Sequence, residues 1–253
     1  MGSRTARRIQ LILFGVVGAS SLLAAVLVAT GSLTADGISL TALTSFVTFG
    51  NLGVAPSASK QSAAAPPGRV ADSVIAFTKA HGNPPDATYG RISIPAISVN
   101  APLTYRLVDG APGAAMPDPS GPTDVAYYDM SKWPGLGGVP GAGHNAIFGG
   151  HVDLNRPIPY AGGAQYIGPA VFWALDKLRV GDGVEITIAG GTTLKYAVVS
   201  VKELPSSGNT DWNTIWSGNV KKDTVTLFTC GGNFDSKAHE YTSRTVVRAE
   251  RVA

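Results

Sequence analysis

Apolar and polar side chains alternate over short runs through most of the chain after residue 90, and glycine, proline or asparagine bounds many of these runs. Alternation with a period of two is typical of a β-strand that has one buried face. The pattern predicts strands at 91–95, 97–103, 126–128, 145–148, 184–188 and 194–201. Several short strands separated by turns favour an all-β barrel or sandwich.

Two further runs carry the most distinctive residues of the chain. The run from Thr224 is rich in β-branched and aromatic side chains and leads to Cys230, the single cysteine of the chain, before Gly231 and Gly232. We expect the glycines to end this strand and to leave Cys230 at its C-terminal tip. A second such run, 245–249, begins just after Arg244. If the two strands pair, a thiol and a guanidinium meet.

The N-terminal region predicts a membrane anchor. Residues 9–30 contain no charged side chain, and this apolar stretch is long enough to form a transmembrane helix. Three arginines precede this stretch, and the next basic residue is Lys60. This asymmetry places the N-terminus in the cytoplasm and the rest outside. A cleaved signal peptide is the alternative, but its apolar region is normally ~7 to 15 residues, so we favour a retained anchor.

Composition then divides the chain into three parts. Residues 1–31 form the basic tail and anchor, and 32–70 form a juxtamembrane segment and a linker rich in Ala, Ser and Pro. Residues 71–253 form the extracytoplasmic domain, which begins with a predicted helix at 71–80. The net charge of +3 comes from the three N-terminal arginines. No basic stripe interleaved with aromatic residues points to nucleic acid.

Cys230 has two readings. In a cytosolic protein, a lone cysteine is usually a small buried apolar residue. Outside the cell a single cysteine cannot form an internal disulfide, so an intermolecular bond or a reactive thiol becomes the better interpretation. Because the thiolate is the nucleophile and a free thiol has a pKa of about 8.5, catalysis requires a nearby imidazole or cation.

Among the four histidines, His151 is the best candidate for that imidazole. It follows a predicted strand and two glycines, which places it at a second strand end, whereas His144 precedes the same strand and would lie at its other end. His81 and His239 are expected in loops. Asp153 shares the strand parity of His151 and could orient the imidazole, or it could be an ordinary loop aspartate.

Arg244 could stabilise negative charge that develops on a carbonyl oxygen, although most arginines form surface ion pairs. Arg248 has the same strand parity and is the competing candidate. The sequence contains no metal-ligand spacing, no phosphate loop and no internal repeat. We therefore expect neither a metal nor a cofactor.

The run Thr226-Leu-Phe-Thr-Cys230 resembles the T-L-x-T-C signature of sortases, the membrane-anchored cysteine transpeptidases of Gram-positive cell envelopes. The segments 91–95, 150–153 and 178–182 and the downstream Arg244 also resemble that family, over about 90–252. The resemblance implies a closed barrel of about eight strands with short helices. It implies catalytic roles for His151, Cys230 and Arg244 and a supporting role for Thr229.

The Gly-His-Val-Asp segment and the single anchor are most similar to class E and F sortases of actinobacteria. No C-terminal transmembrane tail follows Ala253, unlike many class C members, and the loop 201–224 does not resemble a calcium-binding loop. The resemblance implies cleavage of an LPXTG-like sorting signal on surface proteins, through a thioester acyl-enzyme. It also implies transfer to an amine of a peptidoglycan precursor of the lipid II type, at the cell membrane.

Two other functions stay open from the residues alone. An L,D-transpeptidase is also an exported cysteine enzyme rich in β-structure, but its Ser-His-Gly-Cys context is absent, because Phe228 and Thr229 precede Cys230. A cell-surface β-domain that binds a partner without chemistry is the third hypothesis. It predicts that Cys230 can be replaced without loss of function.

Overall fold

The structure is a computed structural model that describes residues 67–111, 113–208, 210–237 and 240–252. The predicted anchor, the juxtamembrane segment and most of the linker lie outside these residues, as does His239. Within the described ranges, no helix combines the length and apolarity needed to cross a bilayer.

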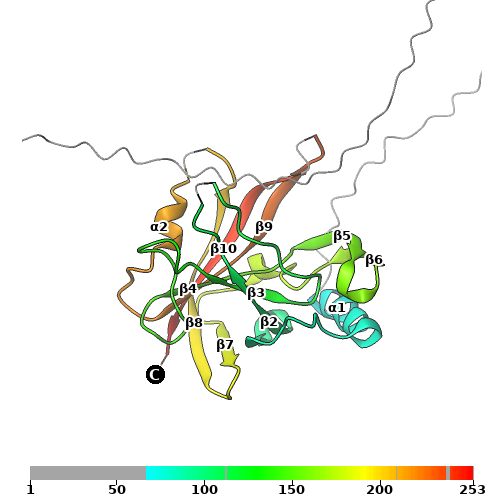
Figure 1. Cartoon of the computed structure of the whole chain (residues 1–253), viewed down its shortest axis with the longest axis horizontal. Helices are drawn as coiled ribbons and strands as arrows, with labels where there is room; N and C mark the ends of the chain where they lie inside the picture. The colour runs from blue at the N-terminus through cyan, green and yellow to red at the C-terminus, as the bar shows by residue number, and fades with distance from the viewer. Residues whose placement is uncertain (1–66, 112, 209, 238–239, 253) are drawn as a thin grey trace, which may run out of the picture. The chain divides into compact units, whose positions relative to one another are not determined.

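Eight strands close into a barrel, as the sequence predicts, in the order β1-β2-β3-β4-β9-β10-β8-β7 (Figure 1). Neighbours are antiparallel except for β2 with β3 and β4 with β9, which are parallel. The strands are β1 (Gly90–Ile94), β2 (Val99–Leu107), β3 (Val125–Asp129), β4 (Asn145–Gly149), β7 (Gly183–Ile188), β8 (Thr193–Pro205), β9 (Thr224–Asp235) and β10 (Glu240–Arg251).

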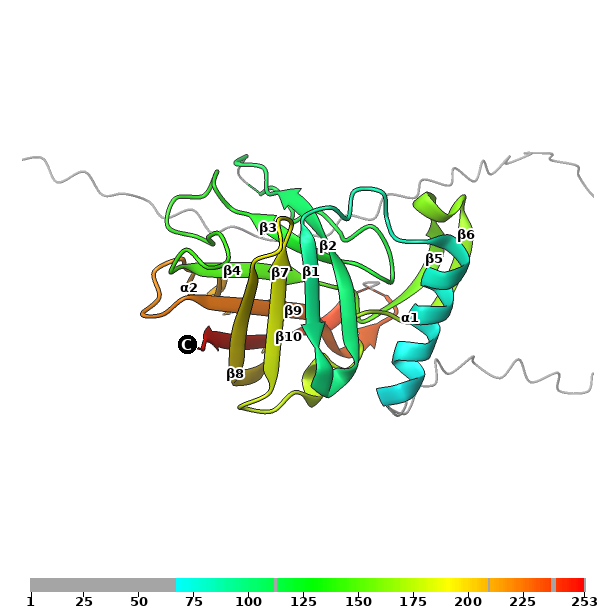
Figure 2. The ribbon, with the colours of Figure 1, turned by 90° about the horizontal axis from the view of Figure 1, so that it is seen from below.

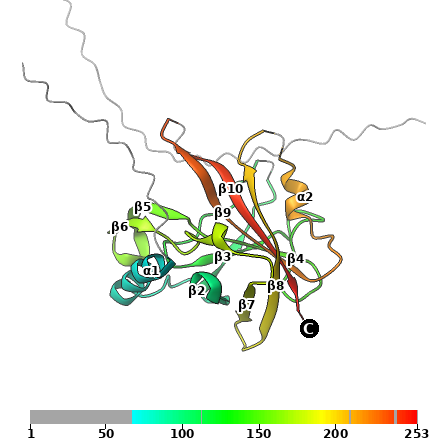
Figure 3. The same ribbon diagram turned by 180° about the vertical axis from the view of Figure 1, so that it is seen from behind.

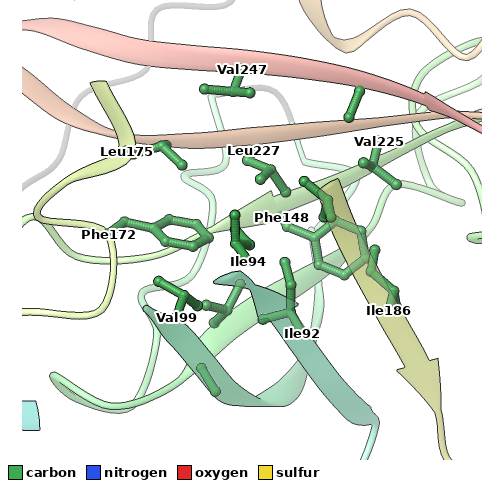
Figure 4. Close-up of a cluster of buried hydrophobic side chains, with 14 of the residues drawn as sticks. Ile92, Ile94, Val99, Phe148, Phe172, Leu175, Ile186, Val225, Leu227 and Val247 are labelled. Atoms are coloured by element: carbon green, nitrogen blue, oxygen red, sulfur yellow. The ribbon is translucent and has the colours of Figure 1, made fainter. Parts of the chain in front are cut away.

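The barrel interior is filled by aliphatic and aromatic side chains from every part of the ring. Figure 4 shows Phe148, Leu227, Val247, Ile92 and Ile186 among the side chains of one core cluster, and all five are fully buried. Burial of one such side chain contributes about 1.5–3 kcal/mol. Because side chains alternate along a strand, the burial of Leu227 turns its neighbours Thr226 and Phe228 to the outer face of the barrel.

Some predicted boundaries are wrong. The helix α1 (Pro67–His81) begins earlier than expected, within the segment assigned to the linker, because proline is well suited to the first helical turn. The predicted strand 97–103 begins only at Val99, since a 3-10 turn (Pro95–Ile97) ends at Ser98 with φ of 57°.

The strand that carries Cys230 is also longer than predicted. β9 continues to Asp235 and stays paired with β10, so Gly231 and Gly232 do not end it. Gly232 has φ of +74°, and the register shifts between Tyr241 and Ser243. Glycine in this conformation allows a β-bulge, so Cys230 lies just before a bulge instead of at a strand tip. Figure 3 shows β9 and β10 running side by side beyond the barrel.

The sequence analysis missed two strands and a short α-helix. β5 (Asp153–Ile158) and β6 (Ala164–Pro169) form a separate two-stranded sheet, and α2 (Trp212–Trp216) is a single short turn of helix. The β5–β6 hairpin lies against α1 outside the barrel (Figure 2), where Phe77, Ile158 and Tyr166 form a small apolar cluster.

Candidate active site

Cys230 on β9 and Arg244 on β10 are directly opposite each other in the antiparallel pair. Directly opposed residues have Cβ atoms about 4.5–5.5 Å apart and point to the same face. Both residues share the parity of Phe228 and Val246, and therefore face the outside of the barrel. The two strands therefore pair as expected, and the charge of Arg244 acts on Cys230, whose pKa it lowers.

The parallel pairing of β4 with β9 places His151 at the same level. Asn145 pairs with Thr224 and Gly149 pairs with Phe228, so the same offset carried two residues past the end of β4 would align His151 with Cys230. Two hydrogen bonds extend the pairing beyond β4. The Gly150 amide donates to the Phe228 carbonyl (3.2 Å), and the Thr229 hydroxyl donates to the Gly150 carbonyl (2.7 Å).

His144 lies at the other end of β4, as expected. Its carbonyl accepts a hydrogen bond from the Thr224 amide (2.9 Å), and its Nδ1 lies 3.2 Å from the Gly218 carbonyl. Since Thr224 begins the strand that later carries Cys230, His144 is separated from the thiol by the length of the strand. Of these two histidines, His151 follows the end of β4 that pairs with the part of β9 leading to Cys230.

The two glycines before His151 are required by close packing. A Cβ on Gly149 would lie 2.8 Å from the Phe228 ring, and a Cβ on Gly150 would lie 2.7 Å from the Phe172 ring. Such contacts are too short for real side chains, so the backbone can approach its neighbours only as glycine. This confirms the interpretation of the pair as a site of close backbone approach.

His151 is held as the neutral imidazole mainly by burial. Burial is the largest effect and lowers the pKa, Asp118 raises it, Arg156 lowers it, and a hydrogen bond with the Pro119 carbonyl raises it; together they bring the pKa of His151 down to about 4. Nη2 of Arg156 lies 3.4 Å from Nε2 of His151. At neutral pH the imidazole is therefore able to accept a proton.

Cys230 is held mainly as a thiol. Burial raises the pKa of Cys230, Arg244 lowers it, and the carboxylates of Asp153, Asp118 and Glu240 raise it. Burial and three acids outweigh one guanidinium, so the charged form is disfavoured before substrate binds. A neutral thiol beside a neutral imidazole can form the thiolate only by passing its proton on.

Arg244 is fixed by its own backbone. Its Nη1 donates to the carbonyls of Ser243 (2.9 Å) and Tyr241 (3.2 Å). A guanidinium has five N–H donors in a planar fork, and the described residues show no hydrogen bond from Nε or Nη2 of Arg244.

Asp153 does not make the contact that the sequence suggested. Its Oδ2 accepts a hydrogen bond of 2.6 Å from the Tyr241 hydroxyl, and the described residues show no hydrogen bond between Asp153 and His151. Strand parity alone could not show that Tyr241, on β10, would reach this carboxylate first. Burial raises the pKa of Asp153 despite the hydrogen bond from Tyr241.

Arg248 lies four residues beyond Arg244 on the same outer face, opposite Thr226. Its Nη2 donates to the carbonyls of Thr214 (3.2 Å) and Ile215 (2.8 Å) on α2. Arg248 is therefore tied to a different element and does not face Cys230 across the strand pair.

An aromatic cluster that includes Phe228, two residues before Cys230, has no counterpart in the sequence-based prediction. The ring of Phe228 lies 5.6 Å from Tyr128 and 5.0 Å from Trp216. The Tyr128 hydroxyl donates to the Pro117 carbonyl (3.0 Å), which ties the segment between β2 and β3 to this cluster. The alternating pattern of β9 marks Phe228 as outward-facing, but the partners of its ring come from distant segments.

The described part of the chain contains no group of three or more His, Cys, Asp or Glu side chains that could hold a metal ion.

A family model of the sortase domain matches residues 92–252. The chain belongs to the sortase family. It is accordingly a sortase-type cysteine transpeptidase. A search of curated proteins found no match.

Several solved sortases resemble this sortase at low identity. Sortase A from Corynebacterium diphtheriae is 19% identical, with a TM-score of 0.46 over 74% of this chain and 84% of that one. The Sortase D5 transpeptidase of Clostridium perfringens is 19% identical, with a TM-score of 0.43 over 66% and 79%. Sortase C of Streptococcus pneumoniae is 18% identical, with a TM-score of 0.45 over 65% and 66%.

Proposed function

We propose that this sortase cleaves an LPXTG-like sorting signal and transfers the cleaved protein to an amine of a cell-wall precursor. The observation that carries the proposal is the pairing of Cys230 with Arg244 across β9 and β10, with His151 brought to the same level by β4. A nucleophile, a proton carrier and an oxyanion donor then surround one point on the outer face.

In the first half of the reaction, the Cys230 sulfur attacks the threonine carbonyl of the sorting signal, and His151 accepts the thiol proton. The carbonyl oxygen becomes negatively charged beside the free donors of Arg244. Collapse of this intermediate breaks the bond to the glycine nitrogen, and the imidazolium returns the proton to that nitrogen. A thioester and a free glycine amine result.

In the second half, an amine of the cell-wall precursor attacks the thioester carbonyl and gives a proton to His151. The Cys230 sulfur leaves as thiolate and recovers that proton, which restores the resting pair. The new amide joins the surface protein to the precursor. A neutral resting His151 suits this step because it must accept a proton from the attacking amine.

The proposed partners are surface proteins with a C-terminal sorting signal and a peptidoglycan precursor of the lipid II type. The apolar stretch 9–30 and the preceding arginines support a single-pass membrane location with the catalytic domain outside. The Gly150-His151-Val152-Asp153 segment supports a class E or F type.

The experiment is mass spectrometry of the full-length chain in detergent after incubation with LPXTG-like and LAXTG-like peptides. We expect an adduct that contains the peptide up to and including its threonine, and we expect none with Cys230→Ala. The peptide that gives the adduct identifies the sorting signal. Cleavage of the peptides by Cys230→Ala at the wild-type rate would contradict the proposal.

A further inference from the structure

Arg156 on β5 lies beside the active site, although no part of the sequence pattern marks it. Its Nη2 is 3.4 Å from His151 Nε2, and its Nη1 is 3.4 Å from Asp118 Oδ2. Nε of Arg156 is buried and has no hydrogen-bond partner among the described residues. The guanidinium is thus shared between an imidazole and a carboxylate.

Only one protonation state of the His151 ring is consistent with its contact with Arg156. A guanidinium can only donate, so Nε2 must offer its lone pair. A neutral imidazole with a free lone pair on Nε2 carries its proton on Nδ1. The Pro119 carbonyl, which can only accept, also hydrogen-bonds to this ring and suits such a proton. An imidazolium would instead set two positive charges against each other.

The position of Arg156 is fixed by elements outside the barrel. Arg156 pairs with Tyr166 across the β5–β6 hairpin, and Tyr166 is buried against Phe77 of α1. The hairpin and helix therefore support a guanidinium next to a residue that follows β4. This gives the small sheet a role in the geometry of the active site.

We propose that Arg156 is a positioning residue of this sortase, which holds His151 as the neutral tautomer with its lone pair on Nε2, and that Asp118 is the counter-ion that limits this effect. The inference rests on the proposed function only for its effect on rate, because the tautomer is a property of the resting protein.

The charges around His151 come from several elements. Arg156 and Asp153 lie on β5, Asp118 lies between β2 and β3, and Cys230 lies on β9 with Arg244 opposite it. Arg156 is the positive group in contact with the ring, and Asp118 is the carboxylate that pairs with it. Removal of Arg156 should therefore raise the pKa of His151, and removal of Asp118 should lower it.

The arrangement has a consequence for catalysis. When the thiol proton reaches Nε2, the contact with Arg156 is lost, and the guanidinium keeps its ion pair with Asp118. A cation beside the imidazolium makes His151 a stronger acid, so the proton passes more readily to the departing amine. Arg156 thereby acts through His151 and does not itself need to touch the substrate.

The test is ¹⁵N NMR of the histidine side chains of the full-length chain in detergent. The chain has four histidines, so loss of one signal in His151→Gln assigns the resonance. We expect wild-type His151 to be neutral at pH 7, with Nδ1 protonated and Nε2 unprotonated. A ring protonated on Nε2 would overturn the proposal without any further variant.

Two variants and one control complete the test. Arg156→Gln should raise the pKa of His151 and allow the second tautomer, whereas Asp118→Asn should lower the pKa further. Arg91→Gln is the control, because Arg91 binds Asn100 at a different part of the barrel, and it should change nothing. An unchanged pKa and tautomer in folded Arg156→Gln would overturn the proposal.

A rate measurement connects this inference to the proposed function. The rate of thioester formation should fall as the pH drops through the pKa of His151. This fall should occur at higher pH in Arg156→Gln and at lower pH in Asp118→Asn. If NMR shows the changes in the pKa of His151 but the pH dependence of the rate stays the same, the effect on proton transfer is refuted while the tautomer assignment holds. Failure of every peptide to form a thioester would count against the proposed function, and the NMR result would still decide the role of Arg156.

Discussion

Replacing Arg244 with lysine separates directional hydrogen bonding from charge. Nη1 of Arg244 donates to the Ser243 and Tyr241 carbonyls, and in the proposed mechanism Nε and Nη2 bind the substrate oxygen. A lysine ammonium has three donors on one atom and cannot hold both carbonyls while also presenting a planar pair to an oxyanion. Arg244→Lys thus keeps the positive charge but loses at least one oxyanion donor.

The expected cost follows from that lost donor. Removal of one oxyanion donor typically costs about 100-fold to 1000-fold in rate, or about 2.7–4 kcal/mol. We therefore expect thioester formation by Arg244→Lys to fall by ~100-fold or more. Alkylation of Cys230 should change little in this variant, because a positive charge still faces the thiol.

Quenched-flow mass spectrometry of the acyl-enzyme and the pH dependence of iodoacetamide alkylation measure these two effects separately. Arg244→Ala should be impaired in thioester formation and should also raise the pKa of Cys230, since Arg244 lowers it in the native site. Arg248→Lys is the matched control. Near-normal thioester formation by Arg244→Lys would refute the directional role, and a fully active Arg244→Ala would show that Arg244 is not needed for thioester formation.

The other predictions concern the support of the site and its location. Thr229→Val removes the hydroxyl that donates to the buried Gly150 carbonyl, which should cost about 1–3 kcal/mol in the free energy of unfolding and lower the rate, whereas Thr229→Ser should retain most of both. In Gly150→Ala, the new Cβ meets Phe172 at 2.7 Å, so urea unfolding should show a loss of about 1–3 kcal/mol; Gly183→Ala, with open space around it, is the control. Protease treatment of intact cells should release the catalytic domain, and a mature protein that begins beyond Thr30 would contradict the anchor.

The strands that carry the nucleophile could be predicted because their pattern is local. Alternation along β9 and the β-branched run of β10 identify both strands, and the spacing of Cys230 and Arg244 allows them to pair. The length of β9 could not be predicted, because Gly231 and Gly232 are typical of a turn. In the structure they lie at a bulge, where continued pairing with β10 stabilises the strand.

The surroundings of His151 were beyond the reach of the sequence. β5 contains Pro157 and is followed by Pro159, and proline argues against a strand, so the position of Arg156 could not be inferred. Asp118 is 33 residues from His151 in the chain, and only the folded segment between β2 and β3 brings them together. The partner of Asp153 depends on the reach of the Tyr241 side chain from β10 to β5, which strand periodicity does not specify.

The central claim is that Cys230 carries the acyl group between the sorting signal and an amine. Peptide mapping of the trapped acyl-enzyme, followed by addition of an amine acceptor, tests it most directly. We expect the adduct on the peptide that contains Cys230, its loss on addition of the amine, and release of a product that joins the sorting-signal fragment to that amine. An adduct on another residue, or an adduct on Cys230 that no amine can discharge, would contradict the account.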